Sequence, residues 1–314
     1  MLLTGSTGFV GACLVRRLIN LGCDVHIITR KQSNKWRIVS VLKDVTEHAV
    51  DLQDFESLSR LINNIKPGVI YHLAAYGAYP FQQDINQIML TNIVGTVNLL
   101  NACIATGFDL FVNTGSSSEY GKKEEAMKET NLLEPNNNYG ASKCSATLFC
   151  QSIAINTQLP IVTLRLFSAY GPYEESTRLI PTVIMSCLNN KNPMLRSGMS
   201  VRDYIFVEDI IDLYLSLMGK NIEPGDIFNA GTGKQHSVYD VVNCIIDLTG
   251  VSVRPIWGVV ERPMIEPASW VADISKAGKK LGWHPTHNIE QGLDKTIRWF
   301  RDNMVVYESR KKDV

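Results

Sequence analysis

The feature that most constrains this chain is a glycine motif that begins at its fifth residue. Gly5, Gly8 and Gly11 are spaced three apart and directly follow the short apolar run of residues 1–3. From Val10 to Leu21 apolar residues recur on one helix face, which predicts a strand, a tight turn and a helix in immediate succession. Glycines in this setting let backbone N–H groups approach a pyrophosphate at the helix N-terminus. The opening therefore predicts the first unit of a dinucleotide-binding fold.

Strands and helices alternate from this unit to about residue 170, which favours a parallel sheet with helices on both faces. The predicted strands cover residues 24–29, 47–50, 69–75, 110–114 and 161–167, and the main predicted helices cover 84–106 and 139–157. Beyond Pro172 short strands mix with predicted helices at 179–190, 208–218, 237–249 and 289–301. We expect an α/β fold: a Rossmann-type doubly wound parallel sheet with a smaller mixed α/β C-terminal substrate lobe.

This pattern also predicts how the chain is divided. Residues 1–172 are expected to form the dinucleotide-binding domain, with residues 201–230 returning to it. Residues 173–200 and 231–301 are expected to form the substrate lobe. The last residues, 302–314, are polar and are expected to fray as a tail.

The end of the second predicted strand bears on the choice of cofactor. Dinucleotide sites usually place an acid there for the ribose 2′-OH, whereas an arginine accommodates a 2′-phosphate. This chain has Arg30 followed by Lys31, which favours NADP; an Arg30 that points into solvent would leave NAD as the alternative. Asp51 and Leu52 follow the third strand and are expected to border the adenine.

The candidate catalytic residues are a tyrosine and a lysine four positions apart, Tyr139 and Lys143. This spacing places them one turn apart on one helix face. A phenol ionises with a pKa near 10, and a neighbouring ammonium is expected to lower that pKa into the range useful for acid–base chemistry. Ser116 lies at the end of the strand that precedes this helix and completes the candidate set.

The charge balance excludes several classes of function. Lys+Arg and Asp+Glu are equal at 31 each, so no basic excess is present for binding nucleic acid. The 7 cysteines form no Cys-x2-Cys pair, which argues against a zinc site or other metal site and fits a reducing cytoplasm. No apolar run or signal peptide predicts membrane association.

Taken in order, the motifs resemble those of the extended short-chain dehydrogenase/reductases that act on nucleotide sugars, over about residues 1–300. The matching segments are Gly5/Gly8/Gly11, His72-Leu73-Ala74-Ala75, Asn92-x2-Gly95-Thr96, Ser116 with Tyr139 and Lys143, Tyr170-Gly171-Pro172, Arg202-Asp203 and Asn229-x-Gly231-Thr232-Gly233.

The resemblance implies a role for each matching position. Tyr139 is the acid–base at the sugar hydroxyl or ketone, Lys143 binds the nicotinamide ribose and lowers the Tyr139 pKa, and Ser116 hydrogen-bonds the reacting oxygen. The implied cofactor contacts are Gly5, Thr7, Gly8, Phe9, Val10, Gly11, Arg30, Lys31, Asp51, Leu52, Leu73, Ala74, Ala75, Asn92, Thr114, Tyr139 and Lys143. The implied contacts to a nucleotide-diphosphate sugar are Tyr76, Tyr79, Ser116, Ser117, Ser168 and, for the diphosphate, Arg202 and Arg262.

Two departures from the family pattern matter for the reaction. The 4,6-dehydratases carry an acid one or two places after the Ser/Thr, where this chain has Ser117 and Ser118; its nearest acid, Glu119, is shifted by one. Dehydration is therefore not expected. In addition, Ser168 stands where the family often has asparagine, which alters one substrate contact.

Three functions fit these residues. The first is an NADPH-dependent reductase of a nucleotide-linked 4-keto-6-deoxy sugar, favoured by Arg30-Lys31 and by likeness of residues 76–80 and 258–262 to the CDP-abequose and CDP-paratose synthases. The second is a 4-epimerase that keeps NAD bound. The third is a non-catalytic cofactor-sensing module, against which the intact Ser, Tyr and Lys set argues.

The family resemblance also implies a homodimer. Its interface would be a four-helix arrangement of helices 84–106 and 139–157 and their copies. Leu148, Phe149 and Ile155 are the candidate apolar contacts.

Overall fold

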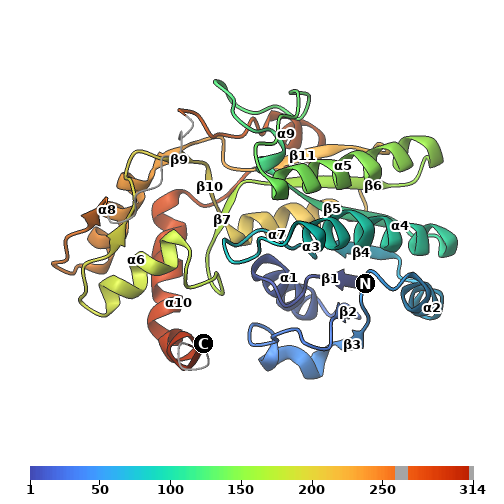
Figure 1. Cartoon of the computed structure of the whole chain (residues 1–314), viewed down its shortest axis with the longest axis horizontal. Helices are drawn as coiled ribbons and strands as arrows, with labels where there is room; N and C mark the ends of the chain where they lie inside the picture. Colours follow the sequence, from blue (N-terminus) through green and yellow to red (C-terminus); the bar gives the residue numbers. More distant parts are fainter. Residues whose placement is uncertain (259–267, 311–314) are drawn as a thin grey trace.

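The protein was analysed as a computed structural model, which describes residues 1–258 and 268–310. Seven parallel strands form the main sheet in the order β11-β6-β5-β4-β1-β2-β3 (Figure 1). Their bounds are β1 Leu2–Thr4, β2 His26–Thr29, β3 Thr46–Ala49, β4 Val69–His72, β5 Leu110–Ser116, β6 Ile161–Leu166 and β11 Ile227–Ala230. The predicted doubly wound sheet is confirmed. The strand order reverses between β1 and β4, and open α/β sheets bind ligands at the carboxyl ends of the strands there.

Helices cover both faces of this sheet. One face carries α2 (Phe55–Ile65), α4 (Gly95–Thr106) and α5 (Asn138–Thr157), which bury a core that includes Leu58, Leu99, Phe111 and Cys150. The other face carries α1 (Phe9–Asn20) and α7 (Val207–Ser216), whose core continues into the C-terminal part of the chain. The sheet is therefore buried on both sides, as parallel sheets require.

Most of the remaining elements gather at one side of the sheet, where α6 (Leu179–Leu188), α8 (Val238–Thr249) and α10 (Ile289–Arg310) lie together (Figure 1). The short helix α9 (Ser275–Leu281) instead contacts β11 of the main sheet. Three small sheets accompany them: β7 (Ser168–Tyr170) with β10 (Tyr204–Phe206), β9 (Val201–Arg202) with β12 (His236–Ser237), and β8 (Met194–Leu195) with β13 (Ile256–Trp257). Two short 3-10 helices, η1 Val39–Asp44 and η3 Ser117–Glu119, complete the fold.

Two helices differ from the sequence-based expectation. The helix expected at 84–106 consists of α3 (Ile85–Met89), a π-helical stretch η2 (Leu90–Val94) and α4. π-bulges of this kind often occur at functional sites. The last helix is kinked at Asn303, close to its expected end near 301, and a second helical stretch continues to Arg310 within the expected polar tail. The reason is Tyr307, which is buried and packs against the rings of Trp36, Trp299 and Phe300.

The segment Ile85–Thr106 is also long and apolar enough to cross a membrane by length and composition alone. Its α4 part packs against α2 and α5 and contributes Leu99 and Leu100 to the core. Core helices of soluble proteins pass the same test, so this feature is weak support for a membrane span.

Candidate active site

One cavity of about 1540 Å³ runs along the carboxyl ends of the strands. It begins at the glycine turn and the ends of β2 and β3, passes the ends of β4 and β5, and reaches the segment around β8 and β9. Most of the predicted site residues line it: Gly5, Thr7, Gly8, Phe9, Val10, Gly11, Arg30, Asp51, Leu52, Leu73, Ala74, Ala75, Tyr79, Thr114, Ser116, Ser117, Tyr139, Lys143, Ser168 and Arg202.

The glycine turn leaves no room for side chains. Gly5 has φ +69°, and a Cβ there would lie 2.5 Å from the backbone of Ala74. A Cβ on Gly11 would lie 2.2 Å from the carbonyl oxygen of Gly5. No side chain caps the N-terminus of α1, so its first N–H groups can meet an anionic ligand at the positive end of the helix dipole. This geometry fits the pyrophosphate of a dinucleotide.

The far end of the cavity, beside β2 and β3, is polar. Arg30 follows β2, has an exposed side chain and lines the cavity together with Ser33 and Asn34. The Arg30 N–H donates to the Ser33 hydroxyl at 3.0 Å, which holds this turn together. Asp51 lines the same end, after β3. These residues fit an adenosine moiety, with Arg30 as the cationic group.

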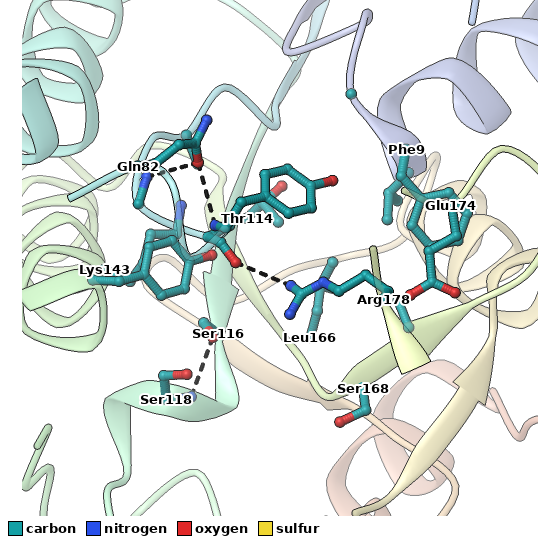
Figure 2. Close-up of a pocket in the computed structure, with 18 of the residues that line it drawn as sticks. Phe9, Gln82, Thr114, Ser116, Ser118, Lys143, Leu166, Ser168, Glu174 and Arg178 are labelled. Atoms are coloured by element: carbon teal, nitrogen blue, oxygen red, sulfur yellow. Dashed lines mark hydrogen bonds between the residues drawn. The ribbon is translucent and has the colours of Figure 1, made fainter. Parts of the chain in front are cut away.

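The three candidate catalytic residues come from two adjacent elements. Ser116 is the last residue of β5, and its Oγ accepts a hydrogen bond from the Ser118 N–H at 3.1 Å (Figure 2). Tyr139 lies in the first turn of α5, which Asn137 caps by accepting from the Gly140 N–H at 2.8 Å. Lys143 follows one turn later and is buried. The strand end and the helix start therefore bring the three side chains into one cavity.

The expected lowering of the Tyr139 pKa is wrong for this structure. Burial raises the pKa of the Tyr139 phenol to about 12, and the buried carboxyl of Glu119 raises it further, while Arg178 and a hydrogen bond with the Ser116 side chain oppose this. Burial also lowers the pKa of the Lys143 ammonium to about 8. Desolvation of the phenolate thus outweighs the nearby positive charge.

Glu119 is the acid that stands one position later than the acid of the 4,6-dehydratases, and it does not line the cavity. Its side chain is fully buried and faces away, with Oε2 accepting from the Arg165 Nε–H at 2.8 Å. Its Oε1 accepts from the Ser116 N–H at 2.8 Å and from the Thr147 hydroxyl at 3.1 Å. Glu119 therefore has a structural role behind Ser116, one of the candidate catalytic residues.

Four predicted residues are not part of the cavity wall that the structure describes. Lys31 is exposed beside it. Asn92 lies behind the wall, where its side chain binds both the N–H and the C=O of Tyr76 at 2.8 Å and donates to the Ser142 hydroxyl. Asn92 thus braces the loop after β4 against α5, and Tyr76 itself does not line the cavity. Arg262 lies outside the described residues.

The structure adds cavity residues that the sequence did not single out. Arg178 donates to the Ala78 carbonyl oxygen at 3.0 Å and lies over the Tyr79 ring, so it links the segment before α6 to the loop after β4. The Trp270 indole N–H donates to the Ser117 hydroxyl at 3.2 Å, and Arg202 stacks on the Trp270 ring. Arg178 and Trp270 stand alone in the sequence, outside any recurring pattern, which is why no motif points to them.

His72 is a buried side chain with a structural role. His72, between Thr4 and Thr96, accepts or donates hydrogen bonds at 2.7 and 2.8 Å, and burial lowers its pKa to about 3. It is the packed, neutral histidine that its place in a buried strand predicts.

Within residues 1–258 and 268–310, no group of three or more His, Cys, Asp or Glu side chains could hold a metal ion.

Comparisons with known proteins agree with this architecture. Residues 1–231 match the NAD dependent epimerase/dehydratase family. A dTDP-glucose 4,6-dehydratase of Neisseria meningitidis serogroup B is 28% identical over 339 residues, covering 98% of this chain and 95% of the relative. A trifunctional UDP-glucose 4,6-dehydratase, 3,5-epimerase and reductase of Arabidopsis thaliana is 29% identical over 320 residues; the match takes in 96% of this chain, which spans only 47% of that relative.

Solved structures are similar over nearly the whole chain. A UDP-glucose 4-epimerase of Thermotoga maritima, solved with UDP-glucose, has a TM-score of 0.89 and 26% identity, covering 96% of this chain and 99% of that one. A UDP-glucuronic acid 4-epimerase of Bacillus cereus, solved with UDP-glucuronic acid and NAD, has a TM-score of 0.84 and 28% identity, covering 96% and 98%.

Proposed function

Because the chain belongs to the NAD-dependent epimerase/dehydratase family, we propose that it transfers a hydride at C4 of a nucleotide-diphosphate sugar. In detail, we propose a reductase that uses NADPH to reduce the ketone of a nucleotide-linked 4-keto-6-deoxy sugar. The relatives described above are dehydratases, 4-epimerases and one trifunctional enzyme whose name includes a reductase, so the choice of reduction rests on the site itself.

The observation that carries the proposal is the polar wall at the adenosine end of the cavity. Arg30, Ser33 and Asn34 line it together directly after β2, where a bare ribose 2′-OH is usually met by an acid. A 2′-phosphate carries close to two negative charges and three acceptor oxygens. A guanidinium and two neutral polar side chains suit such a group, which supports NADPH as the reductant.

At the other end of the cavity, Tyr139 is the group that can supply the proton that reduction requires. NADPH held along this cavity would supply the hydride for C4, and the ketone oxygen would then need a proton from the protein. Tyr139, with a pKa of about 12, keeps its proton at neutral pH and can give it to that oxygen. Ser116 can donate a hydrogen bond to the same oxygen, and the Lys143 ammonium, one turn along α5 on the same cavity wall, would bind the nicotinamide ribose.

We predict that the protein does not eliminate water from a nucleotide sugar. The positions after Ser116 are Ser117 and Ser118, and the Glu119 carboxylate is held by Arg165 outside the cavity. No carboxylate in this part of the described site is therefore available to abstract the C5 proton. Incubation with dTDP-glucose, UDP-glucose or GDP-mannose should give no 4-keto-6-deoxy product by NMR. The Escherichia coli relative described as dTDP-glucose 4,6-dehydratase 1 serves as positive control, and formation of that product by this protein would refute the prediction.

A 4-epimerase with bound NAD is the second candidate. It is favoured by the likeness to UDP-glucose and UDP-glucuronic acid 4-epimerases, and it needs the same Ser116, Tyr139 and Lys143. A reductase consumes one NADPH for each sugar reduced, whereas an epimerase interconverts two sugars with no net change in cofactor.

The proposed function is tested with a panel of nucleotide-linked 4-keto-6-deoxy sugars, prepared with separate dehydratases. Reduction predicts loss of NADPH absorbance, dependent on the sugar and matched one to one by a 4-hydroxy product. Interconversion of C4 epimers of a 4-hydroxy nucleotide sugar without added NADPH would identify the epimerase instead.

We also propose a homodimer that forms through α5 and the helical segment 85–106. Leu148, Phe149 and Ile155 on α5 expose about half of their surface, as does Met89 on α3. They lie on two helices that contact each other, and exposed apolar side chains gathered in this way are typical of an association surface.

Phe149→Glu should convert this dimer into a monomer at micromolar concentration, because it places a charge in an apolar interface. Sedimentation velocity is the measurement. Leu21→Glu, at an equally exposed apolar position after α1, is the matched control and should stay dimeric. A wild-type protein that sediments as a monomer would count against the interface.

A further inference from the structure

Arg178 places a guanidinium on the wall of the large cavity, directly before the first turn of α6. The residue is exposed. The described residues give it a single hydrogen bond, from Nη2 to the Ala78 carbonyl oxygen at 3.0 Å, and no salt bridge. A guanidinium has five N–H donors and stays charged at any pH that the protein meets. Most of its donors are therefore open to a ligand that enters the cavity.

Aromatic and backbone contacts hold this guanidinium at a fixed place. It lies over the Tyr79 ring, 5.1 Å from the centroid. Tyr79 in turn stacks on Phe81, with centroids 5.5 Å apart and ring planes at 1°. Gln82 braces the loop that carries Tyr79, because its Oε1 accepts from the N–H groups of Gly77 and Tyr79 at 3.0 and 3.3 Å. A cation fixed in this way loses little conformational freedom when it binds a ligand.

The same loop places Arg178 near Tyr139. A Cβ on Gly77 would lie 3.4 Å from the Tyr139 Cδ2 atom, so this glycine packs on the Tyr139 ring. The next residue, Ala78, accepts the hydrogen bond from Arg178. Figure 2 shows the Arg178 side chain pointing toward the side of the cavity where Ser116 lies. A sugar whose reacting oxygen lies at Tyr139 and Ser116 is therefore within reach of the guanidinium.

We propose that Arg178 is a sugar-binding residue that donates hydrogen bonds to the sugar oxygens at and next to C4, the carbon whose oxygen meets Tyr139. A guanidinium presents N–H groups in a rigid fork, which can bind two neighbouring acceptor oxygens at once. The oxygen at C4 gains negative charge as the ketone is reduced, and a charged donor binds it more tightly in that state. The inference rests on the proposed function in that a nucleotide sugar lies in the cavity with C4 at Tyr139.

The test compares the dissociation constants of a nucleotide sugar and of the matching nucleoside diphosphate for wild type and Arg178→Met. Isothermal titration calorimetry with NADP⁺ present gives both constants. The probes are UDP-glucose with UDP, dTDP-glucose with dTDP and GDP-mannose with GDP, and the sugar that the wild type binds most tightly decides which pair is used. Arg178→Met should bind the nucleotide sugar at least about tenfold more weakly, because a charge-assisted hydrogen bond is lost. Its affinity for the nucleoside diphosphate, which has no sugar, should stay nearly unchanged.

A residue that only links the loop to α6 would give a different result. Equal losses of affinity for both ligands, or no loss for either, would overturn the proposal, because neither outcome depends on the sugar. Arg178→Lys keeps the charge and a donor, so it should retain more affinity for the nucleotide sugar than Arg178→Met; it also serves if Arg178→Met folds poorly. Arg298→Met, at an exposed position on α10 outside the cavity wall, should bind both ligands like the wild type. A wild type that binds none of the nucleotide sugars would reject the proposed function together with this inference.

Discussion

Tyr139→Phe should lower turnover of the nucleotide sugar by at least about a hundredfold, which is the range for loss of a general acid. The substitution removes the hydroxyl that holds the proton for the C4 oxygen and keeps the ring that lines the cavity. Cofactor affinity should change little, because the Lys143 ammonium and the glycine turn remain. The measurement is steady-state turnover, together with the dissociation constant of the cofactor.

Tyr239→Phe is the matched control for this experiment. Tyr239 is exposed on α8 and does not line the cavity, so its loss of a hydroxyl should leave turnover unchanged. A Tyr139→Phe protein that turns over near the wild-type rate would rule out Tyr139 as the proton donor and would leave Ser116 or water in that role.

Arg165→Met should lower the free energy of unfolding by about 3–5 kcal/mol, the usual effect of breaking a buried ion pair from one side. Arg165 is 1% exposed and pairs with the fully buried Glu119 at 2.8 Å, and it also lies over the Tyr120 ring. Methionine fills much of the same volume but leaves the Glu119 carboxylate without its cation. Urea unfolding followed by far-UV circular dichroism gives the difference.

Two comparisons make this stability prediction specific. The double variant Arg165→Met with Glu119→Gln removes both charges and should recover a large part of the loss. Arg298→Ala breaks the exposed pair with Asp294, whose side chains are 72% and 40% exposed, and should cost less than about 1 kcal/mol. An Arg165→Met protein as stable as Arg298→Ala would show that the buried pair contributes little.

Much of the fold follows from local patterns in the sequence. The glycine motif, the alternation of strands and helices, and the small residues after β4 each predict an element on their own, and together they predict the doubly wound sheet that the structure contains. The cavity residues near these motifs could be predicted for the same reason. Residues at the end of a parallel strand, such as Ser116, or directly after one, such as Arg30, come to the carboxyl edge of the sheet whatever the rest of the chain does.

Other features depend on contacts between distant segments and could not be predicted. The last helix extends to Arg310 because Tyr307 packs against Trp36, more than two hundred residues away in sequence. The raised pKa of Tyr139 arises from burial and from Glu119, neither of which is visible in the spacing of Tyr139 and Lys143. Glu174 and Arg178 reach the cavity from a segment without a recognisable motif.

The most direct test of the proposed reductase is its choice between NADPH and NADH. Charge-assisted hydrogen bonds contribute roughly 1.5–3 kcal/mol each, so Arg30 should make the wild-type protein bind NADPH at least about tenfold more tightly than NADH. Arg30→Ala should lose most of that preference and leave NADH affinity nearly unchanged, whereas Lys31→Ala, at an exposed position outside the cavity wall, should keep the preference. Equal affinities of the wild type for the two cofactors would contradict the NADPH assignment and favour the NAD-dependent epimerase.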